Sequence, residues 1–164
     1  MRLAYLNAME TELLTALRSE GVLFAVVGSH AVLAYSSPER PDGSTRTLGD
    51  LDILVDSTIE NLERISRALG RLRMEMSAQR LQAIFTNRQL PNLGGGYGAQ
   101  LFPSIAGVET SEVLNSAQDA TSPVGALPLI SKALLMIAKR AAGRPKDLED
   151  LRALGAIEET PNAA

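Results

Sequence analysis

Residues 49–56 read "GDLDILVD", and this alternation constrains the fold more than any other segment of the chain. Apolar residues recur at every second position from Leu51 to Val55, which is the spacing of a strand with a buried face. Asp50 and Asp52 occupy the intervening positions on the other face, about 7 Å apart. An unpaired carboxylate in a strand is costly. The two aspartates therefore indicate either ion pairs within the protein or a site for a cation.

The composition is that of an ordinary globular chain and excludes several kinds of site. The 164 residues are 45% hydrophobic and 21% charged, which suits one domain with its own core. The net charge of -3 excludes a global basic field for nucleic acid, although a local basic patch stays open. The absence of Cys excludes disulfides, thiol chemistry and Cys-based zinc sites. A single His argues against a His-rich metal site or a Ser/His/Asp triad.

The sequence carries no membrane or export signal. No apolar run approaches the roughly 20 residues that are needed to span a bilayer. The N-terminal stretch "MRLAYLNAMETELL" contains acids and no continuous apolar block, unlike a signal peptide. We therefore expect a cytoplasmic protein with no membrane contact.

Helical and strand-like patterns alternate along the chain. Apolar spacing predicts helices over 3–19, 29–36, 58–72, 78–86, 110–120, 127–143 and 145–156. Short apolar runs predict strands over 22–28, 50–56 and 99–105. Polar or glycine-rich composition predicts loops over 37–49 and 92–98. These patterns predict one α/β or α+β domain over 1–156, with a small sheet covered by helices, and a loose C-terminal tail over 157–164.

Gly28 and Ser29 follow a predicted strand and open a predicted helix. Glycine lets a ligand approach the backbone closely, and unpaired N–H groups at a helix N-terminus suit an anion. The Ser29 hydroxyl adds a polar group and is a candidate N-cap. Taken alone, this pair is typical of an ordinary strand-to-helix turn. Combined with Asp50 and Asp52 on the next strand, it indicates a metal site beside a phosphate-binding turn, an arrangement of the polymerase type.

These motifs, in this order, resemble the nucleotidyltransferase superfamily, and in particular AbiEii-like and related uncharacterised bacterial nucleotidyltransferase-like proteins. The first part of the resemblance lies in "FAVVGSHAVLAYS" (24–36) and "TRTLGDLDILVDSTIENLERISRAL" (45–69). The second part, "LPLISKALLMIAKRAAGRPKDLEDLRAL" (127–154), resembles the family's closing Lys…Gly-Arg-x-Lys-Asp-x-x-Asp-Leu pattern. Together the resemblance covers residues 22–72 and 99–154.

The resemblance implies a mixed-sheet core that binds a nucleoside triphosphate with Mg²⁺ or Mn²⁺. It implies transfer of a nucleotide to a hydroxyl group on RNA, a protein or a small molecule. The implied metal ligands, which also act in catalysis, are Asp50 and Asp52. The implied nucleotide-binding residues are Gly28, Ser29, Arg46, Thr47, Lys139, Arg144 and Asp147. Lys139 is also expected to be catalytic, and Asn61 matches the family's helical Asn.

The third carboxylate of active relatives is expected where this chain has Gln100. In close relatives that acid precedes a segment like Leu-Leu-Thr-x-Ile-x-Gly-Val, which here is "LFPSIAGV" (101–108). An amide offers a neutral oxygen to a metal but cannot act as a general base. Glu75, on an earlier element, is an alternative third acid. Gln100 therefore favours a catalytically degenerate nucleotide-binding relative as the alternative to an enzyme.

The aspartates and the histidine also have purely structural interpretations. Asp50 can start the strand in a turn, while Asp52 forms an ion pair with Arg46. His30 is expected at the surface or in an interface, at the start of a helix, without a catalytic role. The glycines of the 92–98 loop are expected to be flexible rather than a phosphate cradle, because no helix clearly follows them.

The charged residues near the C-terminus have similar structural interpretations. Lys139 suits a solvated helix end, where it favours the helix dipole. Asp147 and Asp150 suit the first turn of the last helix, and Arg144 and Lys146 are their possible partners.

Three functions are consistent with the sequence. The first is a magnesium-dependent nucleotidyltransferase. The second is a nucleotide-binding relative without transfer activity, including a component of a toxin–antitoxin pair with a cognate antitoxin as partner. The third is a small structural or dimerisation module, and an oligomer is open in each case.

Overall fold

The computed structural model describes residues 1–40, 42–94 and 97–156. Within these ranges, seven helices and a five-stranded mixed sheet form an α+β fold, as the sequence predicts. The helices are α1 (Ala8–Ser19), α2 (Gly28–Tyr35), α3 (Ile59–Arg71), α4 (Ala78–Thr86), α5 (Thr110–Ser116), α6 (Lys132–Ala142) and α7 (Pro145–Ala153). The strands are β1 (Phe24–Val27), β2 (Leu51–Val55), β3 (Ala99–Phe102), β4 (Gln118–Ala120) and β5 (Leu127–Leu129). The predicted tail 157–164 and part of the predicted glycine loop, 95–96, lie outside the described residues.

The strand order of the sheet is β3-β2-β1-β5-β4. β1 runs antiparallel to β2 and parallel to β5, and β2 runs parallel to β3. β1 and β2 are inner strands with apolar side chains buried on both faces, so that Leu54 is as inaccessible as Ile53. This explains why β1 reads as a continuous apolar run. In β2, Asp52 alone interrupts full burial.

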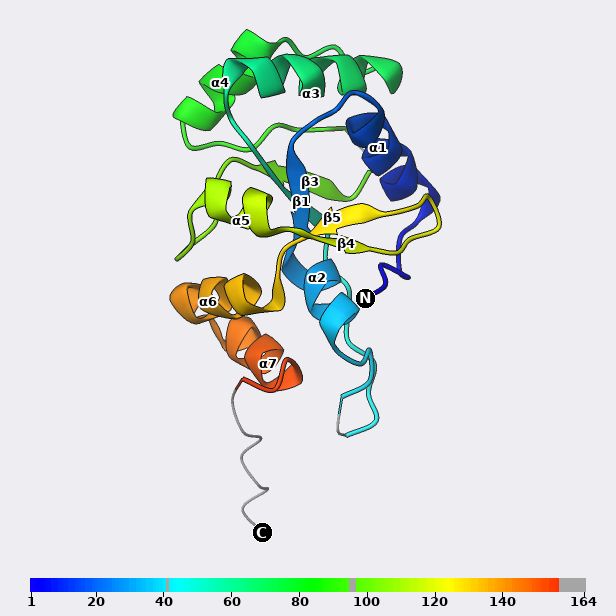
Figure 1. Cartoon of the computed structure of the whole chain (residues 1–164), viewed down its shortest axis with the longest axis vertical. Coiled ribbons are helices and arrows are strands. Elements are labelled where there is room, and N and C mark those ends of the chain that lie inside the picture. The colour runs from blue at the N-terminus through cyan, green and yellow to red at the C-terminus, as the bar shows by residue number, and fades with distance from the viewer. Residues whose placement is uncertain (41, 95–96, 157–164) are drawn as a thin grey trace.

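Six of the described helices gather at two ends of the molecule, and α5 lies at the level of the sheet between them (Figure 1). α1, α3 and α4 lie at one end, and α2, α6 and α7 lie at the other. α2 begins directly at the end of β1, and α7 follows α6 after a tight turn at Gly143, whose φ is +62°. The sheet therefore presents the end of β1 and the start of β2 to the α2, α6 and α7 end of the molecule.

Asn61 joins the ends of two strands rather than facing a ligand. Its side chain is fully buried in α3. The Asn61 Oδ1 accepts the Leu23 N–H at 2.8 Å, and its Nδ2 donates to the carbonyl oxygens of Leu23 and Asp56 at 3.1 and 2.7 Å. The Asn of the resemblance is thus a structural brace that fixes β1 against β2.

The first helix begins at Ala8 and not at residue 3, so the predicted start is wrong. A capping box sets the start, because Asn7 Oδ1 accepts the Glu10 N–H at 2.8 Å and the Glu10 carboxylate accepts the Asn7 N–H at 3.1 Å. The residues before the cap instead lie beside the end of β4, where the Leu3 N–H donates to the Thr121 carbonyl oxygen at 2.8 Å.

Two predicted helices are partly strand. The predicted helix 110–120 ends at Ser116 and is followed by β4, and the predicted helix 127–143 starts with β5. α6 begins only at Lys132, after Ser131 caps its first turn. Strands of three residues are too short to show a period of two, and their pairing with β1 and with each other decides them.

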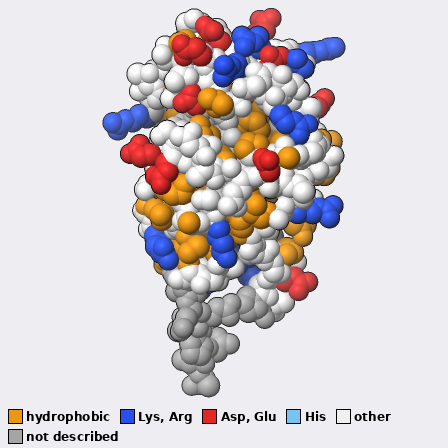
Figure 2. All heavy atoms as spheres, in the orientation of Figure 1, with side chains coloured by type: hydrophobic (Ala, Val, Ile, Leu, Met, Phe, Trp, Pro, Cys, Tyr) orange, Lys and Arg blue, Asp and Glu red, His pale blue; other side chains and the backbone are white. Residues whose placement is uncertain are grey.

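The face of the molecule drawn in Figure 2 mixes acidic and basic side chains, most visibly over the α3 and α4 end. This face carries no large patch of one charge sign, consistent with the absence of a global basic field. Within the described ranges, no helix is long and apolar enough to cross a membrane.

Candidate functional site

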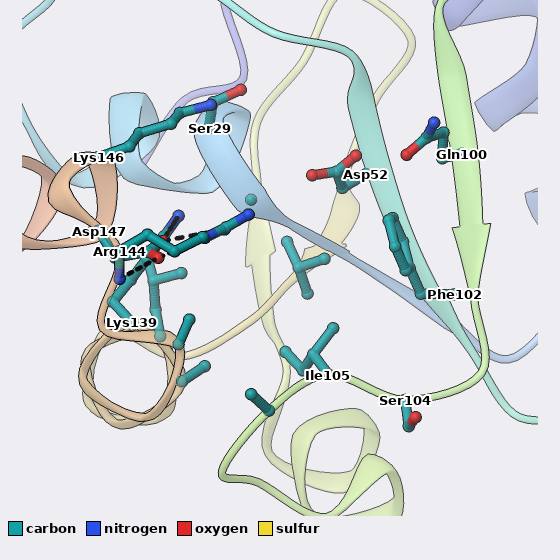
Figure 3. A pocket seen from close by; sticks show the side chains of 16 residues that line it. Ser29, Asp52, Gln100, Phe102, Ser104, Ile105, Lys139, Arg144, Lys146 and Asp147 are labelled. Atoms are coloured by element: carbon teal, nitrogen blue, oxygen red, sulfur yellow. Dashed lines mark hydrogen bonds and ion pairs between the residues drawn. The ribbon is translucent and has the colours of Figure 1, made fainter. Parts of the chain in front are cut away.

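A cleft of about 540 Å³ lies between the end of β1, the strands β2 and β3, and the α6–α7 pair (Figure 3). Its lining residues are Val27, Gly28, Ser29, Asp52, Gln100, Phe102, Ser104, Ile105, Ala106, Leu135, Ala138, Lys139, Ala142, Arg144, Lys146 and Asp147. Most of the predicted site residues are thus brought together, although they come from the two halves of the chain. Three predicted site residues are not in the lining: Asp50, Arg46 and Thr47.

Gly28 and Asp52 share one corner of the cleft. Val27 pairs with Asp52 in the β1–β2 register, so the turn after β1 lies over the Asp52 side chain. Gly28 has a φ of +69°, and a Cβ at this position would stand 2.5 Å from Asp52 Oδ2 and 3.0 Å from Asp52 Cβ. Only glycine satisfies both the backbone angle and this close approach. The turn and the carboxylate are therefore built as one unit.

α2 starts at this turn, one residue earlier than predicted. Its N-cap is Val27 and not Ser29, and no side chain caps its first turn. Ser29 is the second residue of the helix and lines the cleft. First-turn N–H groups without a side-chain cap, next to a serine hydroxyl, suit a bound anion.

Gln100 lies beside Asp52 at the position expected for the third carboxylate. The two residues are register partners on the parallel strands β2 and β3, and both line the cleft (Figure 3). The alternative acid, Glu75, is exposed in the connection between α3 and α4 and is not in the lining. The polar group next to Asp52 on β3 is therefore an amide.

Asp50 directly precedes β2 and is exposed. Its Oδ1 lies 3.8 Å from the point where a Cβ of Gly98 would stand, and the Leu51 N–H donates to the Gly98 carbonyl oxygen at 2.7 Å. Asp50 thus lies by the start of β3, outside the lining of the cleft. Its negative charge is still close enough to contribute to the raised pKa of Asp52.

Asp52 carries a charge that the protein only partly compensates. Burial raises the pKa of its carboxyl group above the ordinary value, and the positive charge of Lys146 is the strongest influence in the opposite direction. Within the described residues Asp52 forms no ion pair, so the alternative pairing with Arg46 is absent. A half-buried carboxylate of this kind suits a bound cation.

Asp147 is fully buried and organises the basic wall of the cleft. Arg144 donates to it from Nε at 2.7 Å and from its backbone N–H at 3.1 Å, and Lys139 Nζ donates at 3.3 Å. Burial alone would raise the pKa of Asp147, but these hydrogen bonds outweigh burial and hold the pKa below its ordinary value. Asp147 therefore orients the basic side chains of Arg144 and Lys139. The nucleotide-binding role that the resemblance implies for Asp147 would act through these two side chains.

Lys146 is the cleft residue that sequence reasoning missed. The sequence suggests that it pairs with the acids of α7, but within the described residues it forms no ion pair. Its Nζ and the Ser29 Oγ each lie 3.7 Å from the point where a Cβ of Gly49 would stand, and Figure 3 shows its side chain directed at Ser29. In the sequence, Lys146 directly precedes the predicted site residue Asp147. Only the orientation of α7 in the structure shows that the Lys146 side chain faces the cleft.

Arg46 and Thr47 line a smaller pocket next to the cleft, of about 40 Å³, which shares Ser29 and Lys146 with it. Arg46 Nη1 pairs with Asp150 at 3.4 Å, and Asp150 also pairs with Lys139 at 2.9 Å. The segment before β2 is thereby tied to α7. Arg46 therefore holds this wall in place, and Ser29 and Lys146 are the residues of the small pocket that also line the cleft.

His30 is buried at 4% exposure, so the expectation of a surface position is wrong. Its Nε2 lies 3.6 Å from the Glu10 carboxylate on α1. Burial lowers the pKa of His30, and the charge of Glu10 opposes this effect. A buried pair of this kind links α1 to α2 and fixes the helix that carries Ser29.

The oxygen groups around Asp52 are of the kind that a hard cation prefers. Within the described residues there is no cluster of three or more acids or imidazoles with metal-site geometry. Asp52 and the neighbouring Asp50 offer carboxylate oxygens, and Gln100 offers an amide oxygen. In proteins in general, Mg²⁺ is usually bound by one or two carboxylates, and water and phosphate oxygens fill its remaining positions.

Comparison of the sequence with protein-family models and with curated proteins finds no match.

Proposed function

We propose that this chain is a nucleotidyltransferase-like protein whose cleft binds the magnesium complex of a nucleoside triphosphate. The observation that carries the proposal is the close approach of Gly28 to Asp52, which brings a strand-to-helix turn and a partly compensated carboxylate into one corner. Basic residues on α6 and α7 face this corner across the cleft. A ligand with both a divalent cation and several phosphate groups matches all three features.

The phosphates would contact the first turn of α2, Ser29 and Lys146. Lys146 forms no ion pair within the described residues, so it can pair with a phosphate without losing a protein partner. The Arg144 side chain is 69% exposed and reaches into the cleft while it holds Asp147 (Figure 3). Lys139 is held by Asp147 and Asp150, and it contributes a positive charge from the base of the cleft.

Asp52 and Asp50 would hold Mg²⁺ or Mn²⁺, with Gln100 as a neutral neighbour. The cation neutralises phosphate charge when it is bound and thereby favours pyrophosphate as a leaving group. In the transfer reaction, an acceptor hydroxyl forms a bond to the α-phosphorus while the bond to pyrophosphate breaks. The proton of the hydroxyl leaves to solvent, because an amide at position 100 cannot take it.

A second candidate is nucleotide binding without transfer, and Gln100 specifically favours it. In this case the cleft holds the nucleotide complex as a ligand, and the protein acts through a partner such as a cognate antitoxin. The acceptor in the first candidate is RNA, a protein or a small molecule. Both candidates place the protein in the cytoplasm, where nucleoside triphosphates are available, as a monomer or an oligomer.

Labelled nucleotides separate these candidates. Wild-type protein is incubated with each α-labelled nucleoside triphosphate, Mg²⁺ and total RNA or protein acceptors, and label transfer and nucleotide binding are both measured. Asp52→Asn is expected to reduce nucleotide binding in the presence of Mg²⁺ by about 100-fold or more, because removal even of a ligand's supporting partner costs 10–100-fold. Asp119→Asn, an exposed acid on β4 outside the cleft, is the matched control and is expected to behave as wild type.

Gln100→Asp then decides between transfer and binding alone. A gain of label transfer in this variant supports the degenerate relative, and full activity in the wild type supports the enzyme. If the wild type neither binds nor transfers any nucleotide with Mg²⁺, both candidates are wrong, and the structural module is the remaining hypothesis. Binding that survives Asp52→Asn unchanged contradicts the assigned metal corner.

A further inference from the structure

The cleft has two chemically different ends. The polar and charged lining residues are Ser29, Asp52, Gln100 and Lys146, together with Lys139, Arg144 and Asp147 on the α6–α7 wall (Figure 3). The other end, where Figure 3 labels Phe102, Ser104 and Ile105, is mostly apolar, and the apolar lining residues are Phe102, Ile105, Leu135, Ala138 and Ala142. Triphosphate and metal account for the first end only, so the second end fits a different part of the ligand.

We infer that the apolar end is a nucleobase site, in which the base of the bound nucleotide stacks on Phe102 opposite α6. This inference rests on the proposed function, since it assigns the base of the same ligand. The occupant follows from continuity: the phosphate corner and the apolar end are parts of one cleft (Figure 3). A nucleotide is polar at one end and has a flat apolar face at the other, as this cleft requires.

Phe102 is placed for this role by the register of β3. Gln100 and Phe102 are two residues apart, so their side chains point to the same face of β3 and stand about 7 Å apart. Figure 3 shows the Phe102 ring between Gln100 and Ile105, along the wall of the cleft. The ring is half-buried, with its remaining surface in the lining of the cleft. The distance between the Phe102 ring and Gln100, which lies beside Asp52, is one that a ribose can span.

The opposite wall is held rigidly by Gly107. Its φ is +79°, and a Cβ at this position would overlap the Ala141 side chain and stand 3.4 Å from the Ile137 carbonyl oxygen. The segment after β3 therefore lies directly on α6. Thr110 Oγ1 closes this segment by donating to the Pro103 carbonyl oxygen at 2.8 Å. The apolar end is thus a preformed slot, which suits a rigid planar group.

The slot recognises a base by its face more than by its edge. Among the described residues of the apolar end, Ser104 carries the single side-chain hydroxyl. A hydroxyl can donate or accept, so it does not distinguish one base edge from another. Stacking on an aromatic ring is sequence-tolerant and contributes between about 5-fold and 150-fold in affinity.

Isothermal titration with two kinds of ligand, nucleotides and a phosphate chain without a base, tests the inference. ATP, CTP and inorganic tripolyphosphate are each titrated with Mg²⁺ into wild type, Phe102→Leu, Phe102→Tyr and Lys146→Ala. We expect the wild type to bind at least one nucleotide about 10-fold more tightly than tripolyphosphate. Phe102→Leu keeps the apolar volume but loses the aromatic face, so we expect nucleotide affinity to fall to that of tripolyphosphate, whose own affinity stays unchanged. Phe102→Tyr retains the ring and is expected to retain the nucleotide preference.

Lys146→Ala is the control for the phosphate end and is expected to weaken nucleotides and tripolyphosphate alike, by about 10-fold. The inference is overturned if wild type binds tripolyphosphate as tightly as every nucleotide, or if Phe102→Leu weakens both ligands equally. In either case the phosphate corner still binds, and the proposed function stands. If neither ligand binds to the wild type, the proposed function itself fails. Melting curves of each variant check that the fold is intact.

Discussion

Asp52 and Asp147 line the same cleft from two walls, but the protein treats their charges in opposite ways. Asp147 is fully buried, and Arg144 and Lys139 hold its pKa below the ordinary value. Asp52 is less buried, and its pKa is nevertheless raised. Burial raises the pKa of both carboxyl groups, but only Asp147 has hydrogen bonds from Arg144 and Lys139 that outweigh this effect.

This contrast separates a structural acid from a ligand-binding one. The charge of Asp147 is balanced within the fold, so its removal is expected to affect stability first. The charge of Asp52 is balanced only weakly and at a distance, chiefly by Lys146, so it is available to a cation that arrives with a ligand. A carboxylate that costs stability in the unliganded protein is a candidate for function.

The largest expected effect is that of Asp147→Ala. Removal of this carboxylate leaves Lys139, which is 10% exposed, and Arg144 without their shared partner. Breaking a buried ion pair in this way costs about 3 kcal/mol of unfolding free energy. Urea denaturation of the unliganded protein measures the change.

The matched control is Glu149→Ala on the same helix, which removes the half-exposed pair with Arg40 at 2.5 Å. A pair of this kind contributes less than about 1 kcal/mol. If both alanine variants lose the same stability, Asp147 is not the structural centre of this wall, and the contrast with Asp52 does not hold.

A smaller effect is expected at the contact of Gly28 with Asp52. Gly28→Ala forces an L-residue into a φ of +69° and brings a methyl group against the Asp52 carboxylate. We expect a loss of about 2 kcal/mol in stability, of which roughly half comes from the backbone angle. We also expect weaker binding of the magnesium–nucleotide complex, because the carboxylate must turn away.

Gly21→Ala isolates the contact. Gly21 has the same φ of +69°, and a Cβ there meets nothing within 4 Å. This variant therefore carries the backbone cost without the contact, and its nucleotide binding should equal that of wild type. Equal stability and equal binding in the two variants would show that the corner tolerates a Cβ and is not built around the carboxylate.

The smallest effect is a gain of stability in Asp52→Asn. Burial raises the pKa of Asp52, so the folded protein binds the proton more tightly than the unfolded chain does. The stability that comes from protonated Asp52 is fully present below about pH 3.9 and is lost as pH rises through the folded pKa. At pH 7 the ionised side chain therefore destabilises the unliganded protein, and the neutral Asn removes this cost.

Thermal melting at pH 7 should show a higher Tm for Asp52→Asn, with about 2–4 °C for each kcal/mol in a chain of this size. The advantage should shrink as pH falls toward the unfolded pKa of the carboxyl group. A variant that melts below the wild type at pH 7, or that keeps a constant difference across this pH range, contradicts the assigned imbalance at Asp52.

Much of the fold follows from local patterns. The structure buries the apolar residues that recur along β2, β1 and α3. The sequence already defines these residues, so the three elements lie where they are predicted. β4 and β5 were missed because each has three residues and exists through pairing with a neighbour. The early start expected for α1 overlooked the Asn7–Glu10 capping box, a signal that was present in the sequence.

The sequence by itself determined the alternation that buries β2, the glycine at the start of α2, the aspartates at the start of β2 and the amide at position 100. The tertiary structure alone decided which charged groups pair. Asp147 forms ion pairs with Lys139 and Arg144, and Asp150 forms ion pairs with Lys139 and Arg46. Within the described residues, Lys146 and Asp52 form no ion pair. The physical reason is that Coulomb attraction and hydrogen bonding act over a few ångströms between side chains from distant segments. The residue types and their spacing can therefore assign candidate site residues to helices and strands. Only the packing of the helices shows which charged side chains have no ion pair and can contact a ligand.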